Sequence, residues 1–234
     1  MTALHHTAPL AARAESATTG AALPPGLASA RNPATIQRIV AAAEKIFAEQ
    51  GLDGARTDAI ARSARVNKAL LYYYFRSKED LHRFTLETLF SQMREQVGGA
   101  MEGSGTPRDR LVGYVNRYFD FTGAHPNYPR LVQREVMGRG QSLQWIVQVY
   151  FGPLYRRLTA TIRSGIARGE FRPVDPQHTA VTIIAMTVFY FAAAPVLGEL
   201  WRCNPLTPGR IAARRRSVLD FLEHGLFQQR VRTR

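Results

Sequence analysis

The chain has 234 residues, of which 45% are hydrophobic, and it carries a formal net charge of +13 with a pI near 10.7. This length allows a substantial core, in one large domain or in a small and a larger one. The positive charge favours an acidic partner, either nucleic acid or an anionic membrane. The single cysteine, Cys203, excludes an internal disulfide and any metal site built from several cysteines, and it fits a cytoplasmic location.

The N-terminal segment, residues 1–32, is rich in Ala, Thr, Ser and Pro and lacks the basic start and apolar run of a secretory signal. We expect it to be a disordered arm. The most apolar stretch, residues 180–197, is just long enough to be considered as a membrane span. Threonines, several alanines and Pro195 interrupt it, so we expect a buried interface helix and no membrane partner.

Helical patterns dominate the remaining chain and no strand pattern is evident, so the expected fold class is all-α. Asn32 and Pro33 are typical of a helix start. An apolar stripe at helical spacing follows and ends at Gly51; it consists of Ile36, Val40, Ala43 and Phe47. A short second helix is predicted with Thr57 as its N-cap, and its buried side carries Ile60, Ala61 and Ala64.

A third helix is predicted over residues 68–74, after a break at residues 65–66, with Asn67 as its cap. Ser77 and Asp80 form a Ser-x-x-Asp box that starts a fourth helix, which runs to about Val97. Two short helices separated by a tight turn and preceded by a longer helix are the pattern of a helix-turn-helix.

Three consecutive tyrosines, residues 72–74, lie on the third helix and cannot all face a core. Leu71 and Phe75 are four residues apart, so they face inward together. The first two tyrosines then point outward between Lys68 and Lys78, and phenols and ammonium groups both donate hydrogen bonds to phosphate oxygens. We interpret this face as a DNA-contacting surface. The alternative, a packing cluster, is the interpretation we favour for the third tyrosine.

The run LYYYFRSKE, residues 71–79, resembles the signature Leu-Tyr-x-x-Phe-x-x-Lys-Glu of the tetracycline-repressor (TetR) family. The resemblance covers about residues 33–82 and implies an all-helical homodimer. It further implies a helix-turn-helix DNA-binding domain over residues 33–82 and a helical domain over residues 83–234 that binds an effector and forms the dimer. The DNA contacts that it implies are Thr57, Lys68, Leu70, Tyr72, Tyr73 and Lys78.

Three positions depart from the family pattern. Arg65 stands in the turn where the family usually has glycine; a left-handed backbone there costs an L-residue about 1 kcal/mol, which a phosphate contact would offset. Asn67 replaces the usual Ser or Thr cap and serves equally well. We add both to the expected DNA-binding residues. Leu70 can touch a thymine methyl group but cannot hydrogen-bond, so the operator sequence is not readable from these residues.

Further helices are predicted in the C-terminal part. They end near His125, cover about residues 129–140, extend over residues 143–167 with a kink at Pro153, and start again at residues 175–176. A last helix is expected over about residues 208–228. The apolar helix around residues 183–197 and this last helix are expected to form a four-helix interface in the homodimer.

The C-terminal part is also rich in aromatic residues, and helical ligand pockets are typically apolar with few polar groups. We expect a small, apolar or aromatic effector, and our candidates for its contacts are Tyr118, Phe121, His125, Arg134, Trp145 and Phe189. Aromatics at helical spacing belong more often to a core than to a pocket. For Arg134 and its neighbour Glu135 we favour a solvated helix face.

No catalytic or phosphate-cradling motif is found, and the six histidines are scattered, so we expect no enzyme, no cofactor and no metal site. The expected function is that of a ligand-responsive transcriptional regulator, a repressor by family resemblance, that binds palindromic double-stranded operator DNA. Two alternatives stay open. One is a helical small-molecule-binding protein or enzyme without sequence-specific DNA binding, and the other is a nonspecific DNA-binding protein.

We predict that removing residues 1–30 leaves folding and dimerisation intact, because this segment has no apolar stripe with which to pack. Thermal unfolding and light scattering of the full and truncated chains test this. A large loss of thermal stability in the truncated chain would show that the arm is packed.

Overall fold

The computed structural model describes residues 32–102, 104–137 and 142–228, and the structural statements below concern these residues. The predicted arm lies outside them except for Asn32. The described chain is helical, and its β-structure is a single antiparallel bridge between Phe171 and Phe227. The expected all-α fold is thereby confirmed. Its elements are α2 (Pro33–Gly54), α3 (Thr57–Ser63), α4 (Lys68–Tyr74), α5 (Lys78–Met93), η1 (Arg94–Gly98), α6 (Pro107–Ala124), α7 (Tyr128–Met137), α8 (Ser142–Ile146), η2 (Val147–Phe151), α9 (Gly152–Ala167), α10 (Pro176–Ala192), α11 (Ala194–Trp201) and α12 (Pro208–Gly225).

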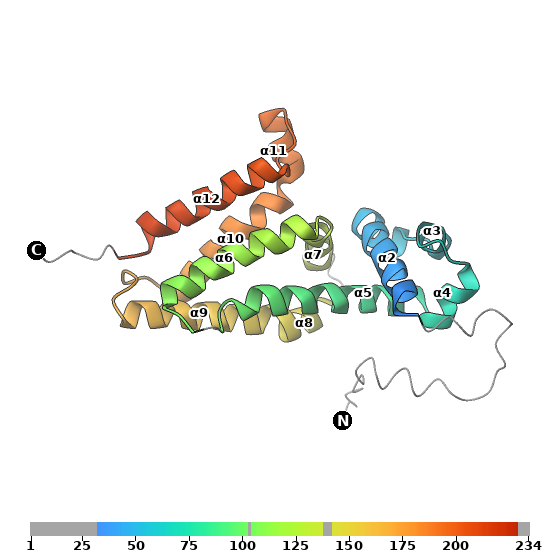
Figure 1. The fold of residues 1–234 in the computed structure, drawn as a ribbon, viewed down its shortest axis with the longest axis horizontal. Helices are drawn as coiled ribbons and strands as arrows, with labels where there is room; N and C mark the ends of the chain where they lie inside the picture. Colours follow the sequence, from blue (N-terminus) through green and yellow to red (C-terminus); the bar gives the residue numbers. More distant parts are fainter. Residues whose placement is uncertain (1–31, 103, 138–141, 229–234) are drawn as a thin grey trace, which may run out of the picture.

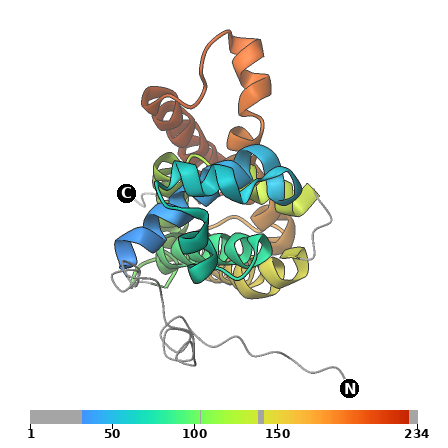
Figure 2. The ribbon, with the colours of Figure 1, turned by 90° about the vertical axis from the view of Figure 1, so that its right-hand side faces the viewer.

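The helices form two groups joined by α5. Helices α2, α3 and α4 lie at one end of the molecule and helices α6, α9, α10 and α12 at the other, while α5 runs from the first group into the second (Figure 1). Figure 2 views the first group end-on and shows α11 projecting away from the body of the second group. The arrangement leaves α3 and α4 at an outer surface of the molecule.

The first group is built on one apolar stripe of α2, which packs against α3 and α5. Val40, Ala43 and Phe47 are buried as predicted, and Ile36 is half-buried at the edge. The regular helix breaks at Gly51, also as predicted, because this residue has a φ of +72°, a conformation that glycine adopts without steric cost. One further helical turn then follows to Gly54.

Two helices of the second group, α6 and α10, begin at side-chain caps. The Thr106 hydroxyl accepts a hydrogen bond from the Asp109 N–H at 3.1 Å, and the Asp109 carboxylate accepts one from the Thr106 N–H at 3.1 Å. This reciprocal box starts α6. The Asp175 carboxylate caps α10, as expected, by accepting a hydrogen bond from the His178 N–H at 2.7 Å. Helix α6 packs against α9 and α12, and α10 packs against α9.

The predicted long helix over residues 143–167 contains a π-helical turn, η2, between α8 and α9. Pro153 explains the irregularity, because its nitrogen carries no hydrogen and its ring would clash with the carbonyl four residues earlier in a regular helix. A wider turn immediately before the proline removes that clash. The predicted disturbance at Pro153 is therefore present as a π turn.

The predicted continuous helix over residues 183–197 is wrong. Helix α10 ends at Ala192, α11 begins at Ala194, and their axes differ by 67°. Pro195 provides the reason, since it cannot continue the hydrogen-bond ladder of α10 but is well tolerated in the first turn of a new helix. The last helix ends at Gly225, three residues before the predicted end.

In the described part of the chain, no helix on its own has the length and apolarity needed to cross a membrane. The bent pair of α10 and α11 has this length and apolarity only when both helices are counted together.

We predict that Gly165→Ala destabilises the protein by about 1–3 kcal/mol, as overpacking of a core does. A Cβ at Gly165 would lie 2.3 Å from the ring of Phe171, which is 1% exposed and stacked on Phe227 at 5.2 Å. Urea unfolding measures the effect. Gly123→Ala in α6 is the matched control, because its added Cβ would have no atom within 4 Å apart from its chain neighbours and the backbone of its own helix. Equal destabilisation at both glycines would contradict the packing argument.

Candidate nucleic-acid interface

The first turn of α3 is linked to α4 by a pair of hydroxyl groups. Helix α3 begins at Thr57, and its N-cap is Arg56, which makes no side-chain cap hydrogen bond. The prediction that Thr57 is the N-cap is therefore wrong by one position. The Thr57 hydroxyl lies 3.3 Å from the hydroxyl of Tyr72 instead. Two residues expected to contact DNA are thus brought together on an exposed surface.

The turn between α3 and α4 contains a strained backbone position. Arg65 has a φ of +56°. This is the left-handed conformation considered above for a residue that stands where the family usually has glycine. Its side chain is exposed, and the N–H of Val66 donates to the Ala61 carbonyl at 3.0 Å to close the turn. An L-residue in this conformation costs about 1 kcal/mol relative to glycine. The turn therefore keeps an exposed guanidinium at the expense of local stability.

Helix α4 presents one face to the core and the other to solvent. The Asn67 side chain accepts a hydrogen bond from the Leu70 N–H at 2.7 Å, so the predicted cap is confirmed. Leu71 and Phe75 are buried as predicted, and Leu70 is half-buried. Tyr72 and Tyr73 are 43% and 37% exposed, whereas Tyr74 is partly buried and packs against the core. The outward face of α4 thus carries the first two tyrosines.

Both lysines expected at this surface are held by partners in the protein. Lys68 Nζ lies 3.0 Å from the Asp58 carboxylate, and the hydrogen bond to Asp58 together with its charge raises the pKa of Lys68. Lys78 Nζ donates to the backbone carbonyl of Asp53 at 3.3 Å. These contacts hold the two ammonium groups beside α3 and at the start of α5.

Further basic residues lie near this surface and were not among the DNA contacts expected from the sequence. Arg56, Arg62 and Arg76 are exposed on or beside α3 and α4. Their positions around the turn are the sequence signal that could have identified them, since all three fall within the predicted helix-turn-helix. They add positive charge where an acidic polymer would lie.

Three of the six effector candidates lie together on α6 and at its end. Tyr118 and Phe121 are buried, and the Phe121 ring stacks on His125 at 4.4 Å and meets Tyr128 edge-on at 5.1 Å. Burial raises the pKa of Tyr114 in the same helix to about 12, and burial also raises the pKa values of Tyr118 and Tyr128. These phenols stay neutral at physiological pH and can donate hydrogen bonds inside an apolar cluster.

The other three candidates lie outside this cluster. Trp145 has the Arg83 guanidinium over its ring at 4.9 Å and lies 5.3 Å from Tyr150. Phe189 is 68% exposed on α10. Arg134 contacts α2: its Nε donates to the Ala48 carbonyl at 2.9 Å.

The favoured interpretation as a solvated helix face is wrong for Glu135, whereas Arg134 is exposed as expected and also hydrogen-bonds to α2. Glu135 is buried, with its carboxylate 3.2 Å from Nε2 of His82 in α5. The sequence held a signal for His82, because it falls on the same helical stripe as Leu86 and Leu89, which are both buried. Its partner, on a helix far along the chain, could not be found from spacing.

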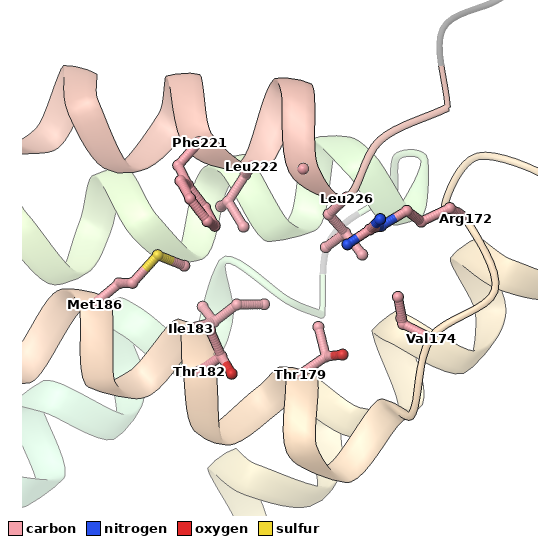
Figure 3. Close-up of a pocket in the computed structure, with 10 residues that line it drawn as sticks. Arg172, Val174, Thr179, Thr182, Ile183, Met186, Phe221, Leu222 and Leu226 are labelled. Atoms are coloured by element: carbon pink, nitrogen blue, oxygen red, sulfur yellow. The ribbon is translucent and has the colours of Figure 1, made fainter.

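A cleft of about 260 Å³ opens between α10, α12 and the segment that precedes α10 (Figure 3). None of the six effector candidates lines it. Its lining comprises Arg172, Val174, Thr179, Thr182, Ile183, Met186, Phe221, Leu222, Gly225 and Leu226. In the described residues, no group of three or more His, Cys, Asp or Glu side chains is arranged to hold a metal ion.

Comparison with known proteins agrees with this arrangement. Residues 39–83 match the bacterial regulatory proteins of the tetR family, and residues 107–222 match the tetracyclin repressor-like C-terminal domain. The HTH-type transcriptional repressor SCO4008 of Streptomyces coelicolor is 35% identical over 173 residues, which cover 74% of this chain and 86% of the repressor. The chain belongs to the TetR family of transcriptional regulators.

Solved structures show the same fold as this TetR-family protein. The transcriptional regulator SCO4942 of Streptomyces coelicolor is 29% identical with a TM-score of 0.60, and the match covers 82% of this chain and 98% of that protein. A transcriptional regulator from Saccharomonospora viridis, solved in complex with choline, has a TM-score of 0.68 at 19% identity, with coverage of 85% and 100%. The matches extend over both helical groups.

We predict that Arg65→Gly raises the stability of this TetR-family regulator by about 1 kcal/mol, because glycine relieves the left-handed strain. The same change should weaken binding to any DNA duplex and lower the slope of log affinity against log salt by about one unit, since the phosphate contact that we expect of Arg65 would be lost. Chemical denaturation and salt-dependent anisotropy measure the two effects.

Arg65→Asn is the matched control, because asparagine tolerates the left-handed region but carries no charge. It should weaken DNA binding as much as glycine does. A gain in stability with unchanged DNA affinity in both variants would contradict the phosphate contact.

Proposed function

We propose that this TetR-family protein is a ligand-responsive transcriptional repressor that binds a palindromic operator as a homodimer and is released by a small, apolar or aromatic effector. In this proposal residues 33–82 form the DNA-binding domain, and residues 83–234 form the effector-binding and dimerisation domain. The recognition helices of two subunits would enter successive major grooves, about one helical turn of DNA apart.

The observation that carries the proposal is the outward face of α4. Tyr72 and Tyr73 are solvent-exposed there, next to Lys68 and the exposed Arg65. A pair of exposed tyrosines among cations suits a duplex, because phenols and cations donate hydrogen bonds to phosphates and base edges. The DNA contacts we propose are Thr57, Arg65, Asn67, Lys68, Leu70, Tyr72, Tyr73 and Lys78.

We assign these residues two kinds of role. Lys68, Leu70 and Tyr72 lie at the start and middle of α4, the recognition helix, and would meet base edges in the major groove. The remaining residues lie at the start of α3, in the turn, late in α4 and at the start of α5, where they would meet phosphates and fix the register.

The homodimer is supported by apolar side chains that a single subunit leaves in water. Val181, Phe189, Val196, Leu200, Trp201 and Phe221 are 47–71% exposed, and all belong to α10, α11 or α12. A large apolar patch of this kind marks an interaction site on a soluble protein. Phe221 also lines the cleft between α10 and α12. A second copy is the partner that two-fold pairing of recognition helices requires.

The proposed effector site is the buried aromatic cluster of α6, with Tyr118, Phe121 and His125 at its centre. This cluster offers apolar surface with a few hydrogen-bonding groups, which is the composition of small-molecule sites in helical proteins. An effector would release DNA only by binding more tightly to a conformation whose recognition helices are wrongly spaced. Trp145, Phe189 and Arg134 remain candidate contacts, although they lie outside this cluster.

Selection of genomic DNA fragments by the purified protein tests the proposal. We expect enrichment of one palindromic sequence, bound by two chains and resistant to nonspecific competitor DNA. Enrichment without sequence preference would indicate a nonspecific binder. Recovery of no DNA would favour a small-molecule-binding protein or an enzyme.

We predict that Phe189→Asp and Phe221→Asp each convert the dimer to a monomer, because each puts a charge into the apolar interface. Each should also abolish tight binding to a palindrome while leaving weak binding to a half-site. Light scattering and anisotropy measure both effects. Val147→Asp, at a position 43% exposed on η2, is the matched control and should remain dimeric. A folded monomer for the unmodified protein would contradict the interface.

A further inference from the structure

Helix α7 is attached to the end of α2 by an arginine that binds backbone carbonyls. Arg134 donates from Nε to the Ala48 carbonyl at 2.9 Å and from Nη2 to the Glu49 carbonyl at 2.5 Å. Carbonyls in the last turn of a helix lack partners within the helix and form the negative end of its dipole, so a guanidinium is well placed there. Gly51 allows this approach, because a Cβ at this residue would lie 3.1 Å from Nη1 of the arginine.

A second attachment lies one residue further along α7. The Glu135 carboxylate is 3.2 Å from Nε2 of His82, and the two side chains are only 10% and 6% exposed. The His82 ring meets Phe47 of α2 edge-on at 4.7 Å. Each polar group of a buried pair loses its hydrogen-bond partner if the other moves away, which is costly out of water. The pair therefore favours one position of α7 against α2 and α5.

A third contact precedes α7. The Asn127 side chain donates to the Glu44 carboxylate of α2 at 3.2 Å. The contacts to Glu44, Ala48 and Glu49 follow α2 over more than one helical turn, so α7 is held along a length of α2 rather than at a single point. Such an attachment restrains both the distance and the rotation of α2 relative to the second group of helices.

We propose that Arg134 and Glu135 are positioning residues that set the orientation of the DNA-binding helices, and thereby the half-site separation that the dimer accepts. The inference rests on the proposed function, because it needs two recognition helices on one operator. Helix α5 alone joins the two groups through the chain, and a single connecting helix can still bend and twist between its two packed ends. The contacts of α7 remove that freedom in each subunit.

The expected consequence follows from the geometry of DNA. One base pair inserted between half-sites turns one half-site by about 35° and moves it by about 3.4 Å, given 10–10.5 base pairs per turn of 34–36 Å. A rigidly mounted pair of recognition helices cannot follow that change. Recognition helices that are held less firmly can follow the change, but they bind the best separation less tightly.

The test measures the affinity for palindromes that share one half-site sequence and differ only in separation. The unmodified dimer should bind one separation best and lose roughly tenfold or more in affinity for one base pair added or removed. For Arg134→Ala we expect the loss to fall below about threefold, with the preference for the half-site sequence unchanged. Measurements are made at a temperature at which each variant is fully folded and dimeric.

Arg130→Ala is the matched control. Arg130 lies one turn earlier on α7, is exposed, and has no ion pair or side-chain hydrogen bond within the described chain. The substitution removes the same charge and should leave the separation profile unchanged. Arg134→Lys, which keeps the charge but loses the two-pronged geometry, should give an intermediate profile and serves if Arg134→Ala does not fold. Glu135→Gln tests separately whether the negative charge of Glu135 in the buried pair is needed for the separation profile.

The outcomes separate the two proposals. If the unmodified protein shows no preferred separation, the dimeric operator function itself is wrong. If it shows one and both Arg134 variants keep it unaltered, Arg134 has no positioning role, whatever its effect on thermal stability. If Arg130→Ala broadens the profile as much as Arg134→Ala, the effect is one of net charge and the inference is overturned.

Discussion

Helix α5 is the element against which both ends of the protein pack, and its straight course constrains where the DNA-reading surface lies. Near its start, Leu81 is fully buried and Phe84 lies 5.4 Å from Phe75 at the end of the recognition helix. Near its end, Phe90 contacts aromatic rings of the second group, those of Tyr128, Tyr150 and Phe151, at 5.5–5.7 Å. Because a hydrogen-bonded helix is stiff along its length, a displacement at one end reaches the other. Helix α7 adds further contacts between the two groups, to α2 and α5.

The reading surface combines local strain with weakly held charges. The left-handed Arg65 and the ion pair of Lys68 with Asp58 are both exposed. Exposed ion pairs contribute about 0–1 kcal/mol, so a phosphate can replace the Asp58 carboxylate at little cost. The same pair restrains the ammonium group of Lys68 beside α3. A protein with a net charge of +13 thus keeps part of its basic surface organised without burying it.

The second group of helices is incomplete as a single subunit. The buried side of α10 holds Ile183 and Tyr190, while Phe189 on the same helix faces water. The bend at Ala193 then directs α11 away from the body of the protein (Figure 2), with Leu200 and Trp201 exposed on it. A helix that is apolar on nearly all sides is stable in water only when it packs on two sides. Packing against a second copy would bury the exposed apolar side of α10.

Local sequence determined much of the secondary structure and the candidate DNA surface. The caps at Asn32, Asn67 and Ser77, the break at Gly51 and the outward tyrosines of α4 follow from residues within one or two helical turns, whose geometry any helix shares. The same local rules placed the cap of α3 one residue too late, at Thr57, because a threonine hydroxyl can also bond elsewhere. It pairs with Tyr72, 15 residues away.

Tertiary structure alone decided how the two helical groups are joined and which side chains meet. Polar residues such as Arg134 and Glu135 look the same in the sequence whether their side chains face solvent or another helix. Only the packed structure shows that Arg134 reaches Ala48, 86 residues earlier. The six effector candidates were likewise chosen by residue type, but in the structure they do not all lie together. Periodicity reports which side of a helix is buried. It contains no information about which helix covers that side, because this depends on contacts between segments that are distant in sequence.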